Sequence, residues 1–350
     1  MMTPATAPQT AASQTLARCR ELVQPALVEA VERLHPWLAD MAAHSLGWAR
    51  TQDGFVPGSQ GKGVRQALTV LCAEAAGAPA ECAVAGAVTV ELVHTFSLVH
   101  DDIMDGDETR RQRESTWKAY GAGPAVLAGD AMCALAAQIL CDSPAAQGGA
   151  AVRHLADALN DMARGQADDL FFEFRPWTGP DAVRVHEYRS MAEHKTGALL
   201  GCATGLGAVL AGAPAATVAG LTRAGRHLGV AFQAVDDLLG IWGDPQDTGK
   251  PVYNDLRRLK KTYPVLAALA SDTLAARQLV WILESGGTLD DAGAGHAADL
   301  VEQAGGRSAT RTEAQQHLDR AHDCLTALDL EPTACDEIRA LLPFLIHRRA

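Results

Sequence analysis

Ala- and Leu-rich runs fill most of this chain, and short Gly/Pro-rich segments separate them. The runs lack the alternation of β-branched and polar residues that strands show, so they favour helix. We therefore predict helices over roughly residues 14–46, 65–77, 80–106, 124–141, 147–173, 179–211, 215–242 and 253–270, with about four more between 273 and 346. No linker is long enough to divide the chain. The pattern predicts one all-α domain over residues 14–350, after a disordered tail at 1–13.

Composition narrows the class of protein. The chain has 350 residues, 48% of them hydrophobic, so it can bury a substantial core. A net charge of −12 argues against a general nucleic-acid-binding surface. The eight cysteines form no C-x-x-C pair, which is typical of free thiols in a cytoplasmic protein. The first residues lack the order of a signal peptide, and we expect no membrane span.

A first acidic cluster ends an apolar run, ELVHTFSLVHDDIMD. In a helix, Asp101 and Asp105 project from one face, with Asp102 beside them. Carboxylates this close repel one another unless a cation lies between them. Mg²⁺ takes oxygen ligands and combines one or two carboxylates with substrate phosphates. Taken alone, the cluster fits a metal site and an acidic helix end equally well.

A second cluster favours the metal site. The segment AFQAVDDLLGIWGD again carries an acidic pair out of an apolar helix, with Asp236, Asp237 and Asp244. Helical proteins commonly build metal sites from facing helices. Two such clusters could hold several Mg²⁺ ions around one polyphosphate.

Cationic residues follow both clusters, and the segments GKGVR and HKTG add others. Each of them alone is more typical of a solvated surface, but their joint placement suits metal-held phosphates, to whose oxygens lysine and arginine donate hydrogen bonds. They are Lys62, Arg65, Arg110, Arg111, Lys195 (followed by Thr196), Lys250, Lys260 and Lys261.

Seven motifs in order complete the pattern: GKGVR, ELVHTFSLVHDDIMDGDETRR, GD at 129–130, GQADDL, HKTGALL, FQAVDD and GKPVYNDLRRLKKTYP. Over roughly residues 55–270 the chain resembles the trans-isoprenyl diphosphate synthases of the polyprenyl synthetase family. The resemblance implies an all-α bundle around a deep central cavity, of the isoprenoid synthase type. It also implies Mg²⁺-dependent joining of an allylic diphosphate to isopentenyl diphosphate, with three Mg²⁺ per active site, and a homodimer.

The resemblance assigns roles residue by residue. Metal ligation would fall to Asp101, Asp105 and Asp236, supported by Asp102, Asp237 and Asp244. The allylic diphosphate would be held by Arg110, Lys195, Gln233, Lys250 and Lys260, with Thr196 beside them. Isopentenyl diphosphate would be held by Lys62, Arg65, His94 and Arg111. Gln166 and Asp169 match a GQxxDL motif beside the reacting carbons.

Three positions depart from the family's pattern. Gly240 stands where the second motif often has an aspartate, and Gly63 and Gln66 stand where an arginine and a proline are common. We expect weaker metal binding from the first change and weaker isopentenyl diphosphate binding from the other two. We also expect the C-terminal HRRA to be solvated, with a basic flap over the site as the alternative.

Product length depends on the residues before the first motif. In the enzymes that this chain resembles, the fourth and fifth residues before that motif flank the floor of the chain pocket. Here they are Ser97 and Phe96. A small Ser97 admits more chain than two aromatics would, whereas Phe96 stops very long products. The sequence therefore predicts geranylgeranyl diphosphate, C20, with farnesyl diphosphate as the alternative and simple core packing of Phe96 as the other reading.

Other classes of protein explain less of the sequence. His94, His100 and Asp101 would suit an HD-type phosphohydrolase, which would leave the second cluster without a role. A class I terpene cyclase needs one aspartate-rich motif and an N-D-x-x-S-x-x-x-E cluster, and NDMARGQAD at 160–168 lacks its Ser and Glu. A non-catalytic partner subunit would not be expected to keep both acidic motifs.

Overall fold

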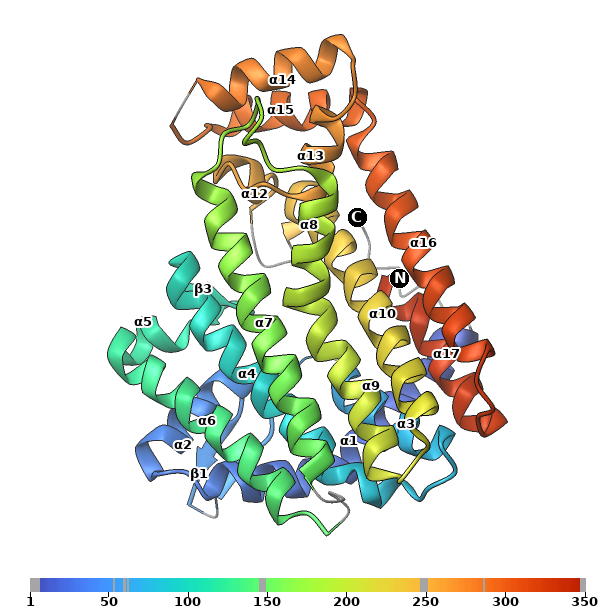
Figure 1. The fold of residues 1–350 in the computed structure, drawn as a ribbon. Helices are drawn as coiled ribbons and strands as arrows, with labels where there is room; N and C mark the ends of the chain where they lie inside the picture. Colours follow the sequence, from blue (N-terminus) through green and yellow to red (C-terminus); the bar gives the residue numbers. More distant parts are fainter. Residues whose placement is uncertain are drawn as a thin grey trace. The chain divides into compact units, whose positions relative to one another are not determined.

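The computed structural model describes residues 7–52, 54–58, 61, 63–144, 149–245, 251–285 and 287–346 (Figure 1). The all-α prediction is confirmed. Within these residues the strands are two short hairpins, β1 (Ala49–Thr51) with β2 (Gly54–Val56), and β3 (Thr109–Arg110) with β4 (Arg113–Glu114). Everything else that is regular is helical.

The chain packs into two compact units. Unit 1 comprises Met1–Asp157, Cys202–Thr222 and Leu325–Leu341, and unit 2 comprises Ala158–Gly201, Arg223–Cys324 and Leu342–Ala350. Assignment of residues 14–350 to a single domain stays a prediction, as does the deep central cavity.

Unit 1 carries the first acidic motif on a pair of packed helices. Its own helices are α1 (Ala7–Glu32), α2 (Pro36–Leu46), α3 (Val64–Ala75), the 3₁₀ turn η1 (Ala80–Ala83), α4 (Val84–Asp105), α5 (Thr116–Tyr120) and α6 (Ala122–Asp142). Helices α4 and α6 lie side by side (Figure 1). The buried Thr89 hydroxyl on α4 donates to the Ala136 carbonyl on α6 at 3.1 Å. This packing fixes the helix that ends in the aspartates.

Unit 2 carries the second acidic motif. Its own helices are α8 (Val185–Ala192), the π turn η3 (Glu193–Gly197), α12 (Asn254–Arg257), α13 (Tyr263–Leu269), α14 (Leu274–Glu284), α15 (Asp291–Gln303) and most of α16 (Gly306–Thr326). Parts of α7 (Ala150–Phe174), α9 (Ala198–Leu210), α10 (Ala215–Trp242) and α17 (Pro332–Ile346) belong to each unit. Leu279, Val265 and Leu300 lie in an apolar cluster of unit 2 that joins α13, α14 and α15.

Several predicted helix boundaries were wrong for local reasons. The predicted helix 14–46 is two helices, because Pro36 begins α2 and the His35 ring accepts a hydrogen bond from the Trp37 N–H there. The predicted helix 253–270 is α12 and α13, and Pro264 sits in the first turn of the second. The predicted disordered tail is wrong for residues 7–13, since α1 begins at Ala7 and buries Ala12; residues 1–6 lie outside the described residues.

Among the described residues, two helices are long and apolar enough to cross a membrane by length and composition, Ala80–Asp105 and Ala122–Asp142. They bury 56% and 39% of their most apolar windows inside the structure, and core helices of water-soluble proteins pass the same test. The absence of a membrane span therefore stays a prediction.

Candidate active site

The first acidic motif occupies the last turn of α4. Gly106 adopts a left-handed φ of 65° and ends the helix directly after Asp105. Asp101 and Asp105 are half-buried on the face that the spacing predicted. Asp102 is only 3% exposed. The three aspartates therefore divide into one buried carboxylate and two that remain partly open to solvent.

Arg110 holds the buried carboxylate. Its Nε donates to both oxygens of Asp102 at 2.8 and 2.9 Å, and its Nη2 donates to Oδ1 at 2.5 Å. Burial would lower the pKa of Arg110, but the hydrogen bonds and charge of Asp102 raise that pKa overall. Arg110, predicted to hold the allylic diphosphate, is thus engaged within the first motif itself.

A cluster of arginines lies near the GKGVR segment, also within unit 1. Arg65 Nη1 lies 3.2 Å from His94 Nε2. Arg20 Nη2, on α1, donates to the Gly61 carbonyl at 2.9 Å. A Cβ on Gly61 would lie 2.7 Å from Arg111 Nη2, so the Arg111 guanidinium rests directly on that backbone. The Arg20 and Arg111 guanidinium groups thus lie against the backbone of this segment, and Arg65 within it reaches His94.

Glu91 lies among these arginines. Its carboxylate accepts from the Gln66 N–H at 3.3 Å. Burial raises the pKa of Glu91, against the lowering effect of Arg65 and Arg111. Burial is also the main cause that lowers the pKa of His94 well below its ordinary value, and the positive charges of the same arginines lower that pKa further. A neutral His94 can accept from Arg65, and the cluster keeps an excess of positive charge suited to a diphosphate.

The β3–β4 hairpin aims Arg111 at this cluster. Its two turn residues, Arg111 and Gln112, both have positive φ, 51° and 62°, as a two-residue hairpin of this hand requires. Left-handed backbone at non-glycine residues costs energy and often marks functional sites. Here the left-handed turn directs the side chains of two successive arginines to different partners. Arg110 reaches Asp102, and Arg111 lies against Gly61.

Two departures from the family's pattern in this segment belong together. Gly63 has a φ of 67°, which favours glycine, and a Cβ there would lie 2.3 Å from Gln66 Nε2. Gln66 is 2% exposed. The absence of a side chain at 63 and the buried amide at 66 are therefore one local solution.

In unit 2, the π turn η3 presents Lys195 and Thr196. Lys195 Nζ donates to Asp169 Oδ2 at 2.5 Å, which joins the HKTG motif to the GQADDL motif. A Cβ on Gly165 would lie 2.2 Å from the Lys195 backbone nitrogen, so α7 and the π turn meet backbone to backbone. Widened turns of this kind are frequent at functional sites. Gln166, half-buried, follows this contact on α7.

Thr196 leads to the second acidic motif. Its hydroxyl donates to Gln233 Oε1 at 2.6 Å, and Gln233 Nε2 donates to Asp237 Oδ1 at 3.0 Å. Asp237 Oδ2 also accepts from the Tyr188 hydroxyl at 2.6 Å and from the Tyr263 N–H at 2.9 Å. Burial raises the pKa of Asp237 to about 7, although these three donors oppose the shift. Three protein donors fit a supporting role for this carboxylate.

Gly240 makes room for another carboxylate. A Cβ at 240 would lie 1.9 Å from Asp255 Oδ2 and 2.6 Å from its Cγ. Asp255, on α12, therefore stands against the position where the family's motif often has an aspartate. Asp236 is half-buried on α10, and Asp244 is exposed beyond the end of that helix.

Some of the remaining predicted cationic residues lie within the described residues and others do not. Lys62, Lys250 and the HRRA segment lie outside the described residues. Lys260 is half-buried after α12. Lys261 lies over the Trp177 ring, 4.3 Å from its centroid, and burial lowers the pKa of Lys261.

The donor set fits Mg²⁺. Among the described residues, no group of three or more His, Cys, Asp or Glu side chains could hold a metal ion by itself. Mg²⁺ needs only one or two carboxylates when phosphates and waters complete its shell. Asp101 and Asp105 on α4, and Asp236 on α10, are partly open carboxylates that suit this role.

Of the two chain-length residues, Phe96 contacts a residue of α4 that reaches α6. The Phe96 ring stands edge-on to the His100 ring, with centroids 5.7 Å apart. His100 in turn contacts the Val126 carbonyl on α6 at 3.1 Å. Ser97 turns its hydroxyl to the His94 carbonyl at 2.9 Å. Both Phe96 and Ser97 remain half-buried.

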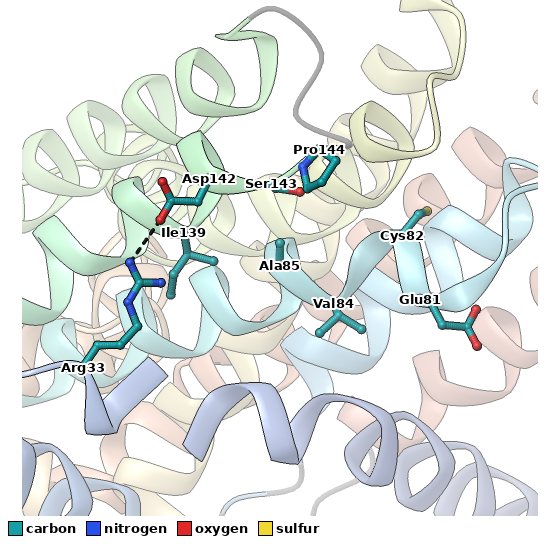
Figure 2. Close-up of a pocket in the computed structure, with 9 residues that line it drawn as sticks. All are labelled: Arg33, Glu81, Cys82, Val84, Ala85, Ile139, Asp142, Ser143 and Pro144. Carbon is teal, nitrogen blue, oxygen red and sulfur yellow. Dashed lines mark hydrogen bonds and ion pairs between the residues drawn. The ribbon is translucent and has the colours of Figure 1, made fainter. Parts of the chain in front are cut away.

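A separate pocket of about 510 Å³ lies at the opposite end of α4 (Figure 2). Arg33 there is paired with Asp142 at 3.0 Å. Val84, which begins α4, is 17 residues before Asp101, so at about 1.5 Å per residue it lies roughly 25 Å along the helix from the motif. The pocket contains none of the predicted site residues.

Sequence reasoning missed the residues that support the motifs. Arg20 and Glu91 join the arginine cluster, and Tyr188 and Tyr263 hold Asp237. Two of them carried a signal, since Glu91 opens the ELVHTFSLVHDD motif and Tyr263 lies in the KKTYP motif.

Comparison with known proteins agrees with the motifs. The polyprenyl synthetase family model matches residues 55–293. The chain is 42% identical over 338 residues to the (2E,6E)-farnesyl diphosphate synthase of Mycobacterium tuberculosis, covering 96% of this chain and 93% of that protein. It is 42% identical over 307 residues to a geranylgeranyl diphosphate synthase of the same organism, covering 87% and 86%. A polyprenyl synthetase structure from Streptomyces coelicolor A3(2) superposes with a TM-score of 0.87 at 44% identity, covering 95% and 99%.

Proposed function

The chain belongs to the polyprenyl synthetase family and is a trans-prenyltransferase, and from that premise we propose that it condenses isopentenyl diphosphate with an allylic diphosphate and stops at C20. The allylic C–O bond breaks, the double bond of isopentenyl diphosphate attacks the resulting cation, and one proton leaves to the departing pyrophosphate. Relatives named for C15 and for C20 products have the same identity to this chain. Product length therefore rests on this chain's own residues.

The arginine cluster of unit 1 carries the choice of reaction. This cluster offers hydrogen-bond donors and positive charge, from Arg65, Arg111 and the neutral His94. Such a site suits a substrate whose diphosphate group is not cleaved in the reaction. A terpene cyclase or an HD-type phosphohydrolase has no use for a second diphosphate site. Isopentenyl diphosphate is the second substrate that gives this cluster a function.

Mg²⁺ supplies charge stabilisation for the leaving pyrophosphate when it is bound, and Asp101, Asp105 and Asp236 would hold it. Lys195, ordered by Asp169 and the π turn, lies on the elements that match the family's allylic site. Asp102 and Asp237 keep the motifs in place through their own hydrogen bonds.

The C20 limit rests on Phe96. Its Cα lies about 7.5 Å along the helix axis from that of Asp101, because five residues each rise about 1.5 Å. The edge-on contact with His100, itself anchored to α6, restrains the Phe96 ring. Ser97 beside it adds little bulk. A restrained ring next to a small residue is suited to stop a growing chain, with C15 as the alternative limit.

The test is a product assay with C5, C10 and C15 allylic partners, isopentenyl diphosphate and Mg²⁺. We expect wild-type enzyme to give mainly C20 and Phe96→Ala to shift the distribution to C25 and longer. His35→Ala, far from the motif on the cap of α2, is the control and should leave the distribution unchanged. Mainly C15 from wild type, or an unchanged distribution in Phe96→Ala, would overturn the C20 proposal.

The setting of the enzyme belongs to the same proposal. All eight cysteines are free thiols, which suits a reducing cytoplasm. We propose a cytoplasmic homodimer without nucleic-acid partners, to be checked by light scattering of the purified protein.

A further inference from the structure

A buried polar network runs from the second acidic motif to α16. It starts at Asp237, whose carboxylate accepts from the Tyr263 N–H at 2.9 Å. The ring of the same tyrosine points the other way, and its hydroxyl donates to Glu313 Oε2 at 2.9 Å. Tyr263 thus joins a carboxylate of the motif to a carboxylate 76 residues further along the chain.

The Glu313 carboxylate has three further side-chain contacts besides the Tyr263 hydroxyl. Arg189 donates to both of its oxygens, from Nε at 2.5 Å and from Nη2 at 2.8 Å. His317 Nε2 lies 3.2 Å from Oε1, one turn along α16. Glu313 is 5% exposed and His317 is 4% exposed. Burial alone would raise the pKa of Glu313, but His317, Arg189 and Tyr263 together lower that pKa well below its ordinary range. A charged, fully hydrogen-bonded carboxylate in the interior has little freedom to move.

The network coincides with apolar packing of the same two helices. Ala314, next to Glu313, forms a buried cluster with Ala234 and Val235, which immediately precede the aspartates of α10. Figure 1 shows α16 running along α10. At the far end, His227 of α10 meets His317 through their Nδ1 atoms at 3.1 Å. Helix α16 therefore contacts α10 at His227 and again at Ala234 and Val235, directly before the motif.

We propose that Glu313 is a positioning residue for the second acidic motif. It fixes Tyr263, the Tyr263 N–H fixes Asp237, and Asp237 together with Gln233 sets the turn of α10 that carries Asp236. The helix α16, outside every motif of the sequence, is then part of the metal-binding machinery. The inference rests on the proposed function for its meaning, since Asp236 is assigned there as a Mg²⁺ ligand.

Tyr263→Phe isolates the link. It keeps the ring and the N–H to Asp237 and removes the hydroxyl, which donates to Glu313 and accepts from Arg189 Nη2 at 3.4 Å. Glu313→Gln keeps the shape and removes the charge. Gln316→Ala, exposed on the same helix, is the matched control. Removing an outer partner of a metal-binding group commonly weakens metal affinity 10- to 100-fold. Because Glu313 acts one residue further out, we expect about a tenfold rise in the Mg²⁺ concentration that gives half-maximal turnover in both variants.

A second readout does not depend on turnover. Inorganic pyrophosphate with Mg²⁺ should raise the melting temperature of wild type and of Gln316→Ala at the same Mg²⁺ midpoint. In Tyr263→Phe that midpoint should move about tenfold higher, while the KM for isopentenyl diphosphate stays unchanged. If the midpoints of Tyr263→Phe match wild type and only the melting temperature without ligand falls, the residue is merely structural and the inference is overturned. Lack of product from wild type would refute the proposed function alone, because the pyrophosphate midpoints still test Glu313.

Discussion

Gly165→Ala tests how closely the allylic side of unit 2 depends on one backbone contact. A Cβ at this position would lie 2.2 Å from the Lys195 nitrogen and 2.7 Å from its Cα and from the His194 carbonyl carbon. Ordinary contacts begin near 3.4 Å. Backbone atoms cannot turn aside as a side-chain end can, so α7 and the π turn must separate by more than 1 Å.

The expected cost to stability is small, and the expected cost to catalysis is large. Overpacking of this kind costs about 1–3 kcal/mol, and replacing a helical glycine by alanine returns up to about 1 kcal/mol. The net loss of folding free energy is therefore about 0–2 kcal/mol. A displacement of about 1 Å of a positioned group can cost roughly 100-fold in rate. Since Lys195 moves with its backbone and away from Asp169, we expect turnover to fall about 100-fold.

The assay compares kcat, both KM values and the melting temperature of Gly165→Ala with those of Gly123→Ala. Gly123 lies in α6, and a Cβ there would meet nothing within 4 Å. The control should keep full activity and change stability by no more than about 1 kcal/mol, because the helix-propensity gain of alanine is opposed by Pro124 after it. Turnover of Gly165→Ala within threefold of wild type would show that the contact does not position Lys195.

Three further predictions follow from the site. Asp101→Ala should lower kcat at least about 1,000-fold with little change in melting temperature, because losing a metal ligand removes several kcal/mol of transition-state stabilisation. EDTA should abolish turnover of wild type. Activity that survives either change would refute the metal assignment. Arg65→Ala should raise the KM for isopentenyl diphosphate about tenfold or more and leave the KM for the allylic diphosphate unchanged. Lys195→Ala should raise the KM for the allylic diphosphate and leave the KM for isopentenyl diphosphate unchanged. An equal rise of both KM values in each variant would contradict two separate sites. Glu313, whose pKa is lowered in the folded state, contributes stability that is fully present above the ordinary carboxyl pKa and is lost progressively as pH falls from that value toward the lowered one. The melting-temperature advantage of wild type over Glu313→Gln should therefore begin to shrink below about pH 5 and keep shrinking at lower pH, and a constant difference would refute the charge argument.

Local sequence rules predicted those parts of the site that lie within one helix. Asp101 and Asp105 share a face because four residues make about one turn, and Gly106 ends the helix as expected of a glycine after a last acidic turn. The paired departures show the limit of such rules. The sequence reveals that Gly63 and Gly240 lack expected side chains, but only the structure shows that Gln66 and Asp255 occupy the space.

Contacts between distant segments could not be predicted. The π turn at residues 193–197 replaced a predicted regular helix, and it packs closely on a distant segment: a Cβ on Gly229 would lie 2.3 Å from the Gly197 Cα. Glu313 offered no signal, because a charged residue on a polar helix is typical of a solvated face. Its burial depends on Arg189, which lies 124 residues away.

The adjacent aspartates of both motifs now have a common physical explanation. In each pair the second residue, Asp102 or Asp237, is 3% exposed and accepts hydrogen bonds from protein donors, whereas the first is half-buried. Neighbouring helical residues point about 100° apart, so one carboxylate can anchor the helix end while the other faces a ligand. The anchors use different donors, a guanidinium for Asp102 and tyrosine, amide and backbone groups for Asp237. Because Asp102 is paired with a guanidinium, whereas the donors that the described residues give Asp237 are neutral, the second motif should depend more on the network behind it, which is where Glu313 and α16 lie.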